Sequence, residues 1–453
     1  MVSRGSENKV ISCPNNHQNP KDSVWCDTCG LPIIDYDREL DLLLRILAEE
    51  EQHTRFAKEN VFLGIGEQGC KLVHEFYRSW GKSLKSSQFL MIESSGEGQQ
   101  FSDLRTQPSD QEYTSPSLSL HLLPMSASKQ VGYYGLGERL ASNDPTLDDR
   151  LLRCGIRAST KKQTVFLFSA LGGGTGSGAS PYVLQRAHAL NPHCRSLVIA
   201  TMPAADEPDS AHFNAFCSLS RFISADQGPL ADMILLMDHD RLMKVRGVGG
   251  MGEEIARESL LSHIVGILVG AIADRDSSQA DPGYLAKMSR SMGIHAFVPC
   301  MAVGRSMEIF GGLASILESA LSSRLAEVDK ESIMISYLLA QVPERLTASL
   351  QAETINAEFN KWNKRSFPHL KGSVLQLSHS SSRAERIDLC LLLGGTRLAI
   401  TAKRAKEGFE RFKAIAKGKA WEQEFGVTSE SVPEAQEAVN RYDARLDEIA
   451  SRT

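Results

Sequence analysis

The sequence lacks any long apolar run. No segment reaches the roughly 18 consecutive apolar residues that a membrane-crossing helix needs. The most apolar stretch, residues 264–273, is too short to span a bilayer. The first residues also lack the pattern of a secretory signal peptide. We therefore expect a cytoplasmic protein with no membrane span.

A strong charge of either sign is also missing. The chain has 50 Lys and Arg against 55 Asp and Glu, so its formal net charge is −5. This slight acidic excess argues against nucleic acid as a partner. The nine cysteines either fall in one metal-like spacing near the start or occur singly. That distribution favours a reducing compartment over a disulfide framework.

The composition of the chain is that of a soluble globular protein, and its length is sufficient for several domains, each with a hydrophobic core. Its hydrophobic content of 42% and charged content of 23% are typical of soluble globular proteins. A length of 453 residues predicts two or three domains.

A glycine-rich run at 169–181, SALGGGTGSGASP, is the feature around which the chain is organised. An apolar segment at 164–168 precedes it, and a helical pattern follows. Five glycines at 172–178 let backbone N–H groups approach an anion, and the following helix adds its N-terminal partial charge. No lysine follows the glycines, which excludes a P-loop. We predict a phosphate-binding loop; the alternative is a flexible linker. The contacting residues would be Gly173, Gly174, Thr175, Gly176 and Ser177.

A metal site is predicted near the start of the chain. The spacing is Cys-x3-His followed by Cys-x2-Cys, with the four ligands Cys13, His17, Cys26 and Cys29. Two such knuckles close a tetrahedral zinc site with no open position, so we expect structural zinc and not catalytic zinc. The alternative is that the cysteines are incidental. The segment also resembles the zinc ribbons of many prokaryotic proteins, although Asn16 and Trp25 replace their usual Gly and Phe.

The run GGGTGSG resembles the signature of the tubulin/FtsZ superfamily of nucleotide-dependent polymerising proteins. This resemblance implies an α/β fold with a Rossmann-type nucleotide-binding domain, a central helix and a second α+β domain. It further implies GTP or GDP as ligand, with magnesium. Taken alone, Gly64-x-Gly66-x-x-Gly69 would indicate a dinucleotide-binding turn. Beside the signature it resembles the family's first phosphate loop, whose positions here are Gly66, Glu67, Gln68 and Lys71. Glu67 departs from the relatives, and its acid could either aid magnesium or repel a triphosphate.

The resemblance assigns further site residues. Glu93 occupies the place of an acid near the terminal phosphate, although an ordinary strand-end carboxylate is equally consistent with it. Gly135 and Gly137 fall in a third phosphate loop, and Glu207 has the spacing of a ribose-contacting acid. His239 stands where relatives carry the Asn that reads guanine. The polar, Ser-rich residues 96–130 suggest an exposed insertion.

Six regions follow from these patterns: a zinc ribbon (1–35), a helical linker (36–58), a GTP-binding domain (59–252), a central helix (253–275), a second domain (276–400) and C-terminal helices (401–453). In the family, acids after the central helix orient the attacking water for the next subunit's nucleotide. Asp281 matches one such acid, whereas Tyr284 replaces the other, so hydrolysis is expected to be slow. Asp274 and Asp276 are alternatives if the loop is shifted.

The second domain is expected to contain helix 312–328, strand 332–339, helix 348–362 and strands 372–377 and 386–393. Charged helices at 401–417 and 432–450 follow, and in tubulin-like relatives such helices lie where partners dock. We therefore expect a GTP-binding protein that assembles head-to-tail with itself, with the zinc ribbon or terminal helices available to a protein partner. The alternatives are a non-polymerising nucleotide-binding scaffold acting through its ribbon and, less well matched, an NAD enzyme.

Overall fold

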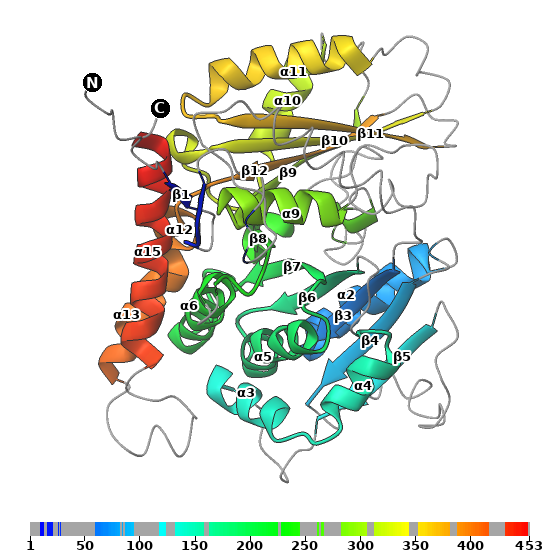
Figure 1. The fold of residues 1–453 in the computed structure, drawn as a ribbon, viewed down its shortest axis with the longest axis vertical. Coiled ribbons are helices and arrows are strands. Elements are labelled where there is room, and N and C mark those ends of the chain that lie inside the picture. Colours follow the sequence, from blue (N-terminus) through cyan, green and yellow to red (C-terminus); the bar gives the residue numbers. More distant parts are fainter. Residues whose placement is uncertain are drawn as a thin grey trace, which may run out of the picture.

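The computed structural model describes residues 10–12, 16–20, 26, 28, 59–81, 84, 87–94, 117–123, 132–157, 163–224, 228–244, 261, 264–266, 282–305, 312–343, 352–380, 387–415 and 431–451. Figure 1 shows an α/β layer that carries the first half of these residues, with a second sheet region and its helices above it.

One 10-stranded sheet runs through both halves of the described chain, in the order β11-β10-β12-β9-β8-β7-β6-β3-β4-β5. Its strands are β3 (Glu59–Ile65), β4 (Ser87–Glu93), β5 (Ser117–Leu122), β6 (Gln163–Ala170), β7 (Arg195–Met202), β8 (Met233–Asp238), β9 (Ala296–Arg305), β10 (Ile335–Pro343), β11 (Gly372–Ser380) and β12 (Ile387–Gly394).

The strands from β3 to β8 are all parallel, as the alternation of strands and helices in the sequence predicts. β3 and β6 lie at the centre of this parallel region. β4 and β5 follow on the side of β3, and β7 and β8 follow on the side of β6. The outermost strand is β5, which pairs with β4 from Gln88↔Ser117 to Glu93↔Leu122. It lies inside the segment 96–130, so the expectation of a simple exposed insertion is wrong for residues 117–122. Its sequence, SLSLHL, alternates polar and apolar residues, which suits an edge strand.

The two halves are joined through the backbone of the sheet. β8 pairs with β9 in parallel at Ile234↔Ala296 and Leu235↔Phe297. The N–H of Ile234 also donates to the His295 carbonyl at 2.7 Å. Beyond β9, β12 runs antiparallel to both β9 and β10, while β11 is parallel to β10. The second-domain strands are thus confirmed, and their sheet continues the first one.

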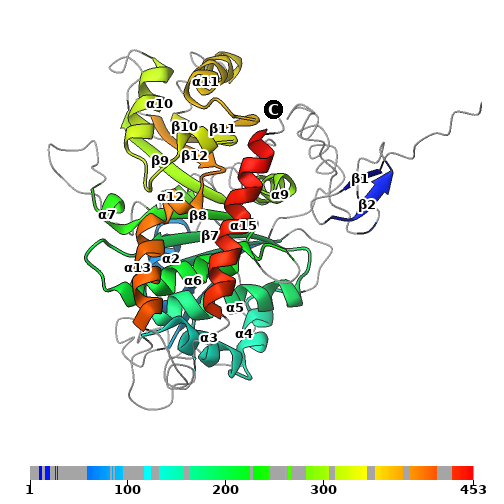
Figure 2. The ribbon, with the colours of Figure 1, turned by 90° about the vertical axis from the view of Figure 1, so that its left-hand side faces the viewer.

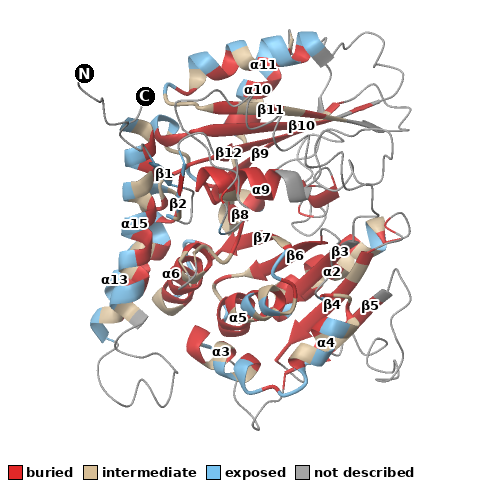
Figure 3. Cartoon of the chain, in the orientation of Figure 1, coloured by how far each residue is buried: buried red, intermediate tan, exposed pale blue. Residues whose placement is uncertain are grey.

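Helices cover the sheet. They are α2 (Gly66–Trp80), α3 (Tyr134–Ser142), α4 (Leu147–Arg153), α5 (Gly174–Leu190), α6 (Asp209–Ile223), α7 (His239–Leu242), α9 (Pro282–Met292), α10 (Leu313–Ser322), η2 (Lys330–Ser332), α11 (Ala352–Ser366), α12 (Leu398–Thr401), α13 (Lys403–Ile415) and α15 (Ser431–Ser451). Figure 3 shows the coloured part of α9 mostly buried and α11, α13 and α15 with one exposed face each. The predicted helices at 348–362, 401–417 and 432–450 correspond to α11, α13 and α15, whereas the helix predicted at 312–328 is shorter and ends at Ser322.

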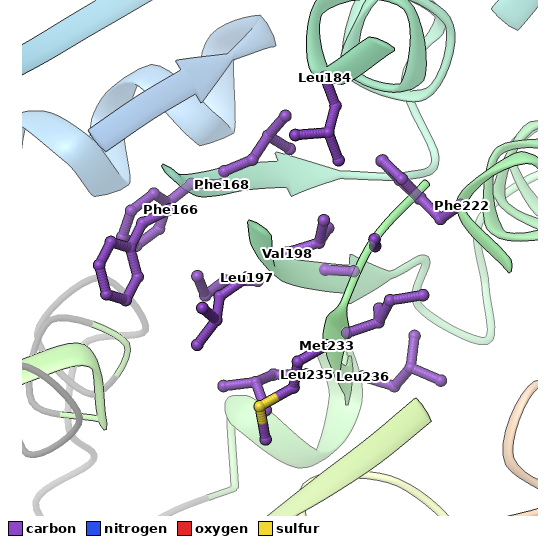
Figure 4. Packing of buried hydrophobic residues seen from close by; sticks show 14 of the residues in the cluster. Phe166, Phe168, Leu184, Leu197, Val198, Phe222, Met233, Leu235 and Leu236 are labelled. Carbon is purple, nitrogen blue, oxygen red and sulfur yellow. The ribbon is translucent and has the colours of Figure 1, made fainter. Parts of the chain in front are cut away.

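The main core lies on both sides of the parallel strands. In Figure 4, Leu197, Met233 and Leu235 lie on one side of the strands, whereas Val198 lies on the side from which Leu184 and Phe222 approach. The Phe62 ring stacks between those of Phe89 and Phe166, with ring centroids 4.8 Å away in each case. A second core lies between the upper strands and helices α10 and α11, and includes Leu338, Leu391 and Trp362.

The C-terminal helices pack on α6, as Figure 2 shows from the side. Phe409 of α13 lies between Phe213 and Phe216 of α6, with ring centroids 5.4 and 4.4 Å away. Tyr442 of α15 accepts a hydrogen bond from the Ala296 N–H at 3.0 Å, which ties α15 to the start of β9. These helices therefore belong to the folded body of the protein.

Near the start of the chain, β1 (Val10–Ser12) and β2 (Gln18–Pro20) form an antiparallel hairpin. Within the described residues, no helix combines the length and apolar content needed to cross a bilayer.

Candidate functional site

The glycine-rich run connects β6 to α5 beside the central strand pair. β6 ends at Ala170, Gly173 is the N-cap of α5, and the helix begins at Gly174. In open parallel sheets, ligands bind at the carboxyl ends of the strands where the strand order reverses, which here is between β3 and β6. Gly173 is exposed, and a Cβ built on it would meet no atom within 4 Å. The loop therefore presents an open side at the start of a helix, where an anion is favoured.

The first glycine turn meets the glycine-rich run backbone to backbone. Gly66 has a φ of +74°, which favours glycine, and a Cβ on it would lie 3.0 Å from the Gly176 nitrogen. A Cβ on Gly176 would lie 2.4 Å from the Ala170 carbonyl oxygen. Both predicted phosphate loops thus lie together, and their contact requires residues without side chains.

Hydroxyl groups of the loop are used to hold its own shape. Ser177 Oγ donates to the Gly173 carbonyl at 2.6 Å, and Ser169 Oγ donates to the Gly176 carbonyl at 2.8 Å. Thr175 Oγ1 lies 2.5 Å from Ser94 Oγ, at the end of β4. Ser177, predicted as a ligand contact, therefore fixes the loop through its side chain in this arrangement.

Glu93 lies at the same end of the sheet. It is buried, and its Oε1 accepts a hydrogen bond from the Ser94 N–H at 2.7 Å. Burial, followed by the negative charge of Glu93, raises the pKa of the Cys70 thiol on α2 well above its usual value. Glu93 thus lies near Cys70 of α2 and next to Ser94, which contacts Thr175.

Glu67 and Lys71 pair with each other on the first turns of α2. Lys71 Nζ lies 2.6 Å from Glu67 Oε1, and the Glu67 side chain is 61% exposed. The pairing offsets the negative charge of Glu67 with the positive charge of Lys71. Gln68, the third predicted contact here, is half-buried.

Gly135 and Gly137 lie in helix α3, where the sequence predicted a loop. A Cβ on Gly137 would lie 2.2 Å from the Gly174 carbonyl oxygen, and one on Gly178 would lie 1.8 Å from the Tyr134 carbonyl oxygen. The glycines thus allow α3 to pack tightly on α5. The Gly-x-Gly pattern alone does not distinguish a loop from a helix surface that packs closely, because both require glycines.

Glu207 and His239 follow the next two strands of the sheet. Glu207 Oε1 accepts from the Ala204 N–H at 2.8 Å, and its Oε2 lies 3.0 Å from the position a Cβ on Gly172 would take. His239 is the first residue of α7 and is half-buried. The Ala205 N–H donates to Asp240 Oδ2 at 3.0 Å, which joins the Glu207 loop to the turn that carries His239.

Asn214 is a site residue that the sequence analysis missed. Its side chain is fully buried in α6, and its Nδ2 donates to the carbonyls of Gly172 and Gly132, each at 2.9 Å. Its Oδ1 accepts from the Tyr134 N–H at 2.9 Å. One amide therefore positions the glycine-rich loop relative to α3. The sequence signal for this role is a polar residue within the apolar stretch Phe213-Asn214-Ala215.

The predicted hydrolytic residues fall largely outside the described part of the chain. Asp274, Asp276 and Asp281 lie outside it, and Tyr284 is placed only as a backbone position in α9. Of the predicted central helix, the described residues 261 and 264–266 are helical and buried. A Cβ on Gly266 would lie 2.4 Å from the Trp80 ring, so this helix packs against α2.

The structure brings together two of the four predicted zinc ligands. Cys26 Sγ lies 3.6 Å from His17 Nδ1, beside the β1–β2 hairpin. Cys13 and Cys29 lie outside the described residues. Among the residues that are described, no group of three or more His, Cys, Asp or Glu side chains is arranged to hold a metal ion.

Comparison with known families adds one match. Residues 59–247 match the profile described as Tubulin/FtsZ family, GTPase domain. This segment of the chain is similar to a Tubulin/FtsZ GTPase domain. No curated protein sequence matches the chain. The Tubulin/FtsZ-like segment covers the strands from β3 to β8, and therefore every predicted nucleotide contact from Gly66 to His239.

Proposed function

We propose that the chain binds GTP or GDP, together with magnesium, at the carboxyl ends of β3, β4, β6, β7 and β8. The glycine-rich loop carries this proposal, because it meets the first glycine turn at the central strand pair and leaves the side of Gly173 open. The match of residues 59–247 to the Tubulin/FtsZ GTPase domain supports the choice of nucleotide.

The residues have distinct roles in this proposal. Backbone N–H groups of residues 173–176 and the N-terminus of α5 bind the phosphates. Glu93 attracts the magnesium ion towards the phosphates, because hard cations prefer carboxylate oxygens. Glu207 binds the ribose, and His239 contacts the base at the position where relatives carry Asn. Magnesium, when bound, neutralises charge that develops on the phosphates.

Nucleotide released from the purified full-length protein tests the binding step. Denaturation followed by ion-exchange chromatography and mass spectrometry should identify GDP or GTP. Recovery of NAD in its place would favour the dinucleotide alternative and overturn the assignment.

We further propose that the protein assembles head-to-tail with itself into filaments. A heterologous interface that does not close into a ring generates an open filament. Support comes from the Tubulin/FtsZ match, since that family assembles in this way. Asp281 would orient the attacking water for the nucleotide of the neighbouring subunit. Because Tyr284 replaces a second acid, we propose that hydrolysis is slow.

Light scattering and negative-stain microscopy test assembly. The expected result is filaments with GTP and magnesium, and more persistent filaments with a non-hydrolysable analogue. Absence of filaments across magnesium, salt and protein concentration would contradict assembly. It would favour the second candidate, a nucleotide-binding scaffold that acts through its N-terminal module.

The N-terminal module is proposed to hold structural zinc on Cys13, His17, Cys26 and Cys29. The 3.6 Å approach of Cys26 Sγ to His17 Nδ1 supports this proposal. Metal analysis of the purified protein should find about one zinc per chain, as four ligands close one site. The Cys26→Ser variant should lose that zinc while keeping nucleotide binding. Retention of zinc by this variant would contradict the ligand set.

A further inference from the structure

Arg404, in the first turn of α13, reaches the turn that carries His239. Its Nη1 lies 2.5 Å from Asp240 Oδ2, and its Nη2 lies 3.3 Å from Asp238 Oδ2. These two carboxylates flank His239 in the sequence. Arg404, more than 160 positions away in the chain, thus pairs with the residues on both sides of His239, the predicted base-contacting residue.

Asp240, which pairs with Arg404, also contacts the loop that carries Glu207. Asp240 Oδ2 accepts hydrogen bonds from both Arg404 and the N–H of Ala205, the latter at 3.0 Å. Burial tends to raise the pKa of Asp240, but the hydrogen bonds from Arg404 and Ala205 hold it below its usual value. Asp240 therefore stays ionised while it joins the loop after β7 to the turn after β8.

The turn that carries His239 has little stability of its own. α7 has four residues, and so short a helix depends on tertiary contacts. Its N-cap is Asp238, whose Oδ1 accepts the Asp240 N–H at 3.0 Å. The neighbouring cation, Arg241, pairs instead with Glu327. Without the Arg404 guanidinium, two carboxylates on one turn would repel each other.

We propose that Arg404 is a positioning residue that fixes His239 and the Glu207 loop, and so sets the affinity and base preference of the nucleotide site. This inference rests on the proposed GTP binding. It assigns to the C-terminal helix α13 a part in reading the base, through two carboxylates that do not themselves need to touch the nucleotide.

Calorimetric titration of the full-length protein with GTPγS and with ATPγS, each with magnesium, tests the inference. Arg404→Ala should weaken GTPγS binding about threefold to fivefold, the upper end of what the loss of a partly exposed charge pair produces. It should also bring the ratio of the ATPγS dissociation constant to the GTPγS dissociation constant closer to one. Arg404→Lys should restore part of the affinity, because it keeps the charge but loses the two-pronged guanidinium.

Arg411→Ala is the matched control. Arg411 lies on the same helix and pairs with Asp209 of α6 at 2.7 Å, so its loss also weakens the docking of α13. This variant should keep both the affinity and the base ratio of the wild type. Equal effects of Arg404→Ala and Arg411→Ala would show a merely structural role and overturn the inference.

The outcomes separate the inference from the function on which it rests. If the wild type binds neither nucleotide, the proposed function fails and the inference with it. If the wild type binds and Arg404→Ala binds with unchanged affinity and ratio, only the inference is overturned. If Arg404→Ala does not fold, Asp240→Asn decides in its place, because it keeps the size of the side chain and should weaken GTPγS binding in the same direction.

Discussion

Two glycines of the glycine-rich loop differ in how much space surrounds them. Because Gly178 has no side chain, α3 can pack closely on α5. Gly173, in contrast, has open space beside it, which a ligand could occupy. We therefore expect Gly178 to matter for packing and Gly173 for ligand binding. The sequence alone does not distinguish these two roles.

Alanine substitutions should show this separation. Gly178→Ala should destabilise the protein by about 3 kcal/mol or more, because its Cβ would lie 1.8 Å from the Tyr134 carbonyl oxygen. Gly173→Ala should change stability by less than about 1 kcal/mol, since its φ of −81° suits alanine, yet should weaken nucleotide binding. Urea unfolding and titration with GTPγS measure the two effects. Equal stability of the two variants would contradict the close α3–α5 packing.

Buried His295 makes stability depend on pH. Burial lowers its pKa from 6.5 to about 4, although its hydrogen bond to the Asp232 carbonyl favours the charged form. Between these values the unfolded chain binds more protons, so stability is present above pH 6.5 and is lost as the pH falls towards 4. The loss at the acid end is about 3 kcal/mol.

His295→Asn should flatten this dependence, because asparagine keeps a donor but does not titrate. Urea unfolding between pH 7 and pH 4 measures it, with His193→Asn at an exposed position as the control. An unchanged slope in His295→Asn would contradict a neutral buried imidazole.

Among the elements, α6 links the site to the rest of the molecule. Its Asn214 holds the glycine-rich loop, and its Phe213 and Phe216 contact α13. The parallel strands, the glycine turns and the terminal helices could be predicted because their signals are local periodicities. The helical α3 and the Asn214 contacts could not be, because each depends on neighbours distant in sequence. The alternation of β5 is short and lies within a Ser-rich segment, which favours an exposed insertion equally.

The aromatic contact between α6 and α13 should be essential for docking the C-terminal helices. Phe409→Ala should cost about 3–5 kcal/mol, because the ring is fully buried between two phenylalanines. Limited proteolysis should then cut near α13 sooner than in the wild type. Lys403→Ala, an exposed change on the same helix, is the control. Unaltered stability of Phe409→Ala would mean that α13 is not held by this contact.

At the scale of the whole molecule, the sheet continues from the Tubulin/FtsZ-like segment into the second half through β8 and β9. The end of β8 that leads into His239 is thus part of the same sheet as β9. This continuity was not predicted from the sequence, because the pairing of β8 with β9 involves segments separated by the central helix.

Hydrolysis should depend on Asp281, which lies outside the segment that matches the GTPase domain. Asp281→Ala should lower GTP turnover by at least about tenfold, since a water-orienting base is lost, while GTPγS binding stays unchanged. Phosphate release at protein concentrations that support assembly measures this effect. Normal turnover would show that Asp281 does not act on the attacking water.

Calorimetric titration of the wild-type full-length protein with GTPγS and magnesium tests the central claim most directly. We expect saturable binding of about one nucleotide per chain, as one set of loops rings one site, with displacement by GDP. Heat no greater than dilution, or displacement by NAD and not by GDP, would contradict a guanine-nucleotide site at the junction of β3 and β6.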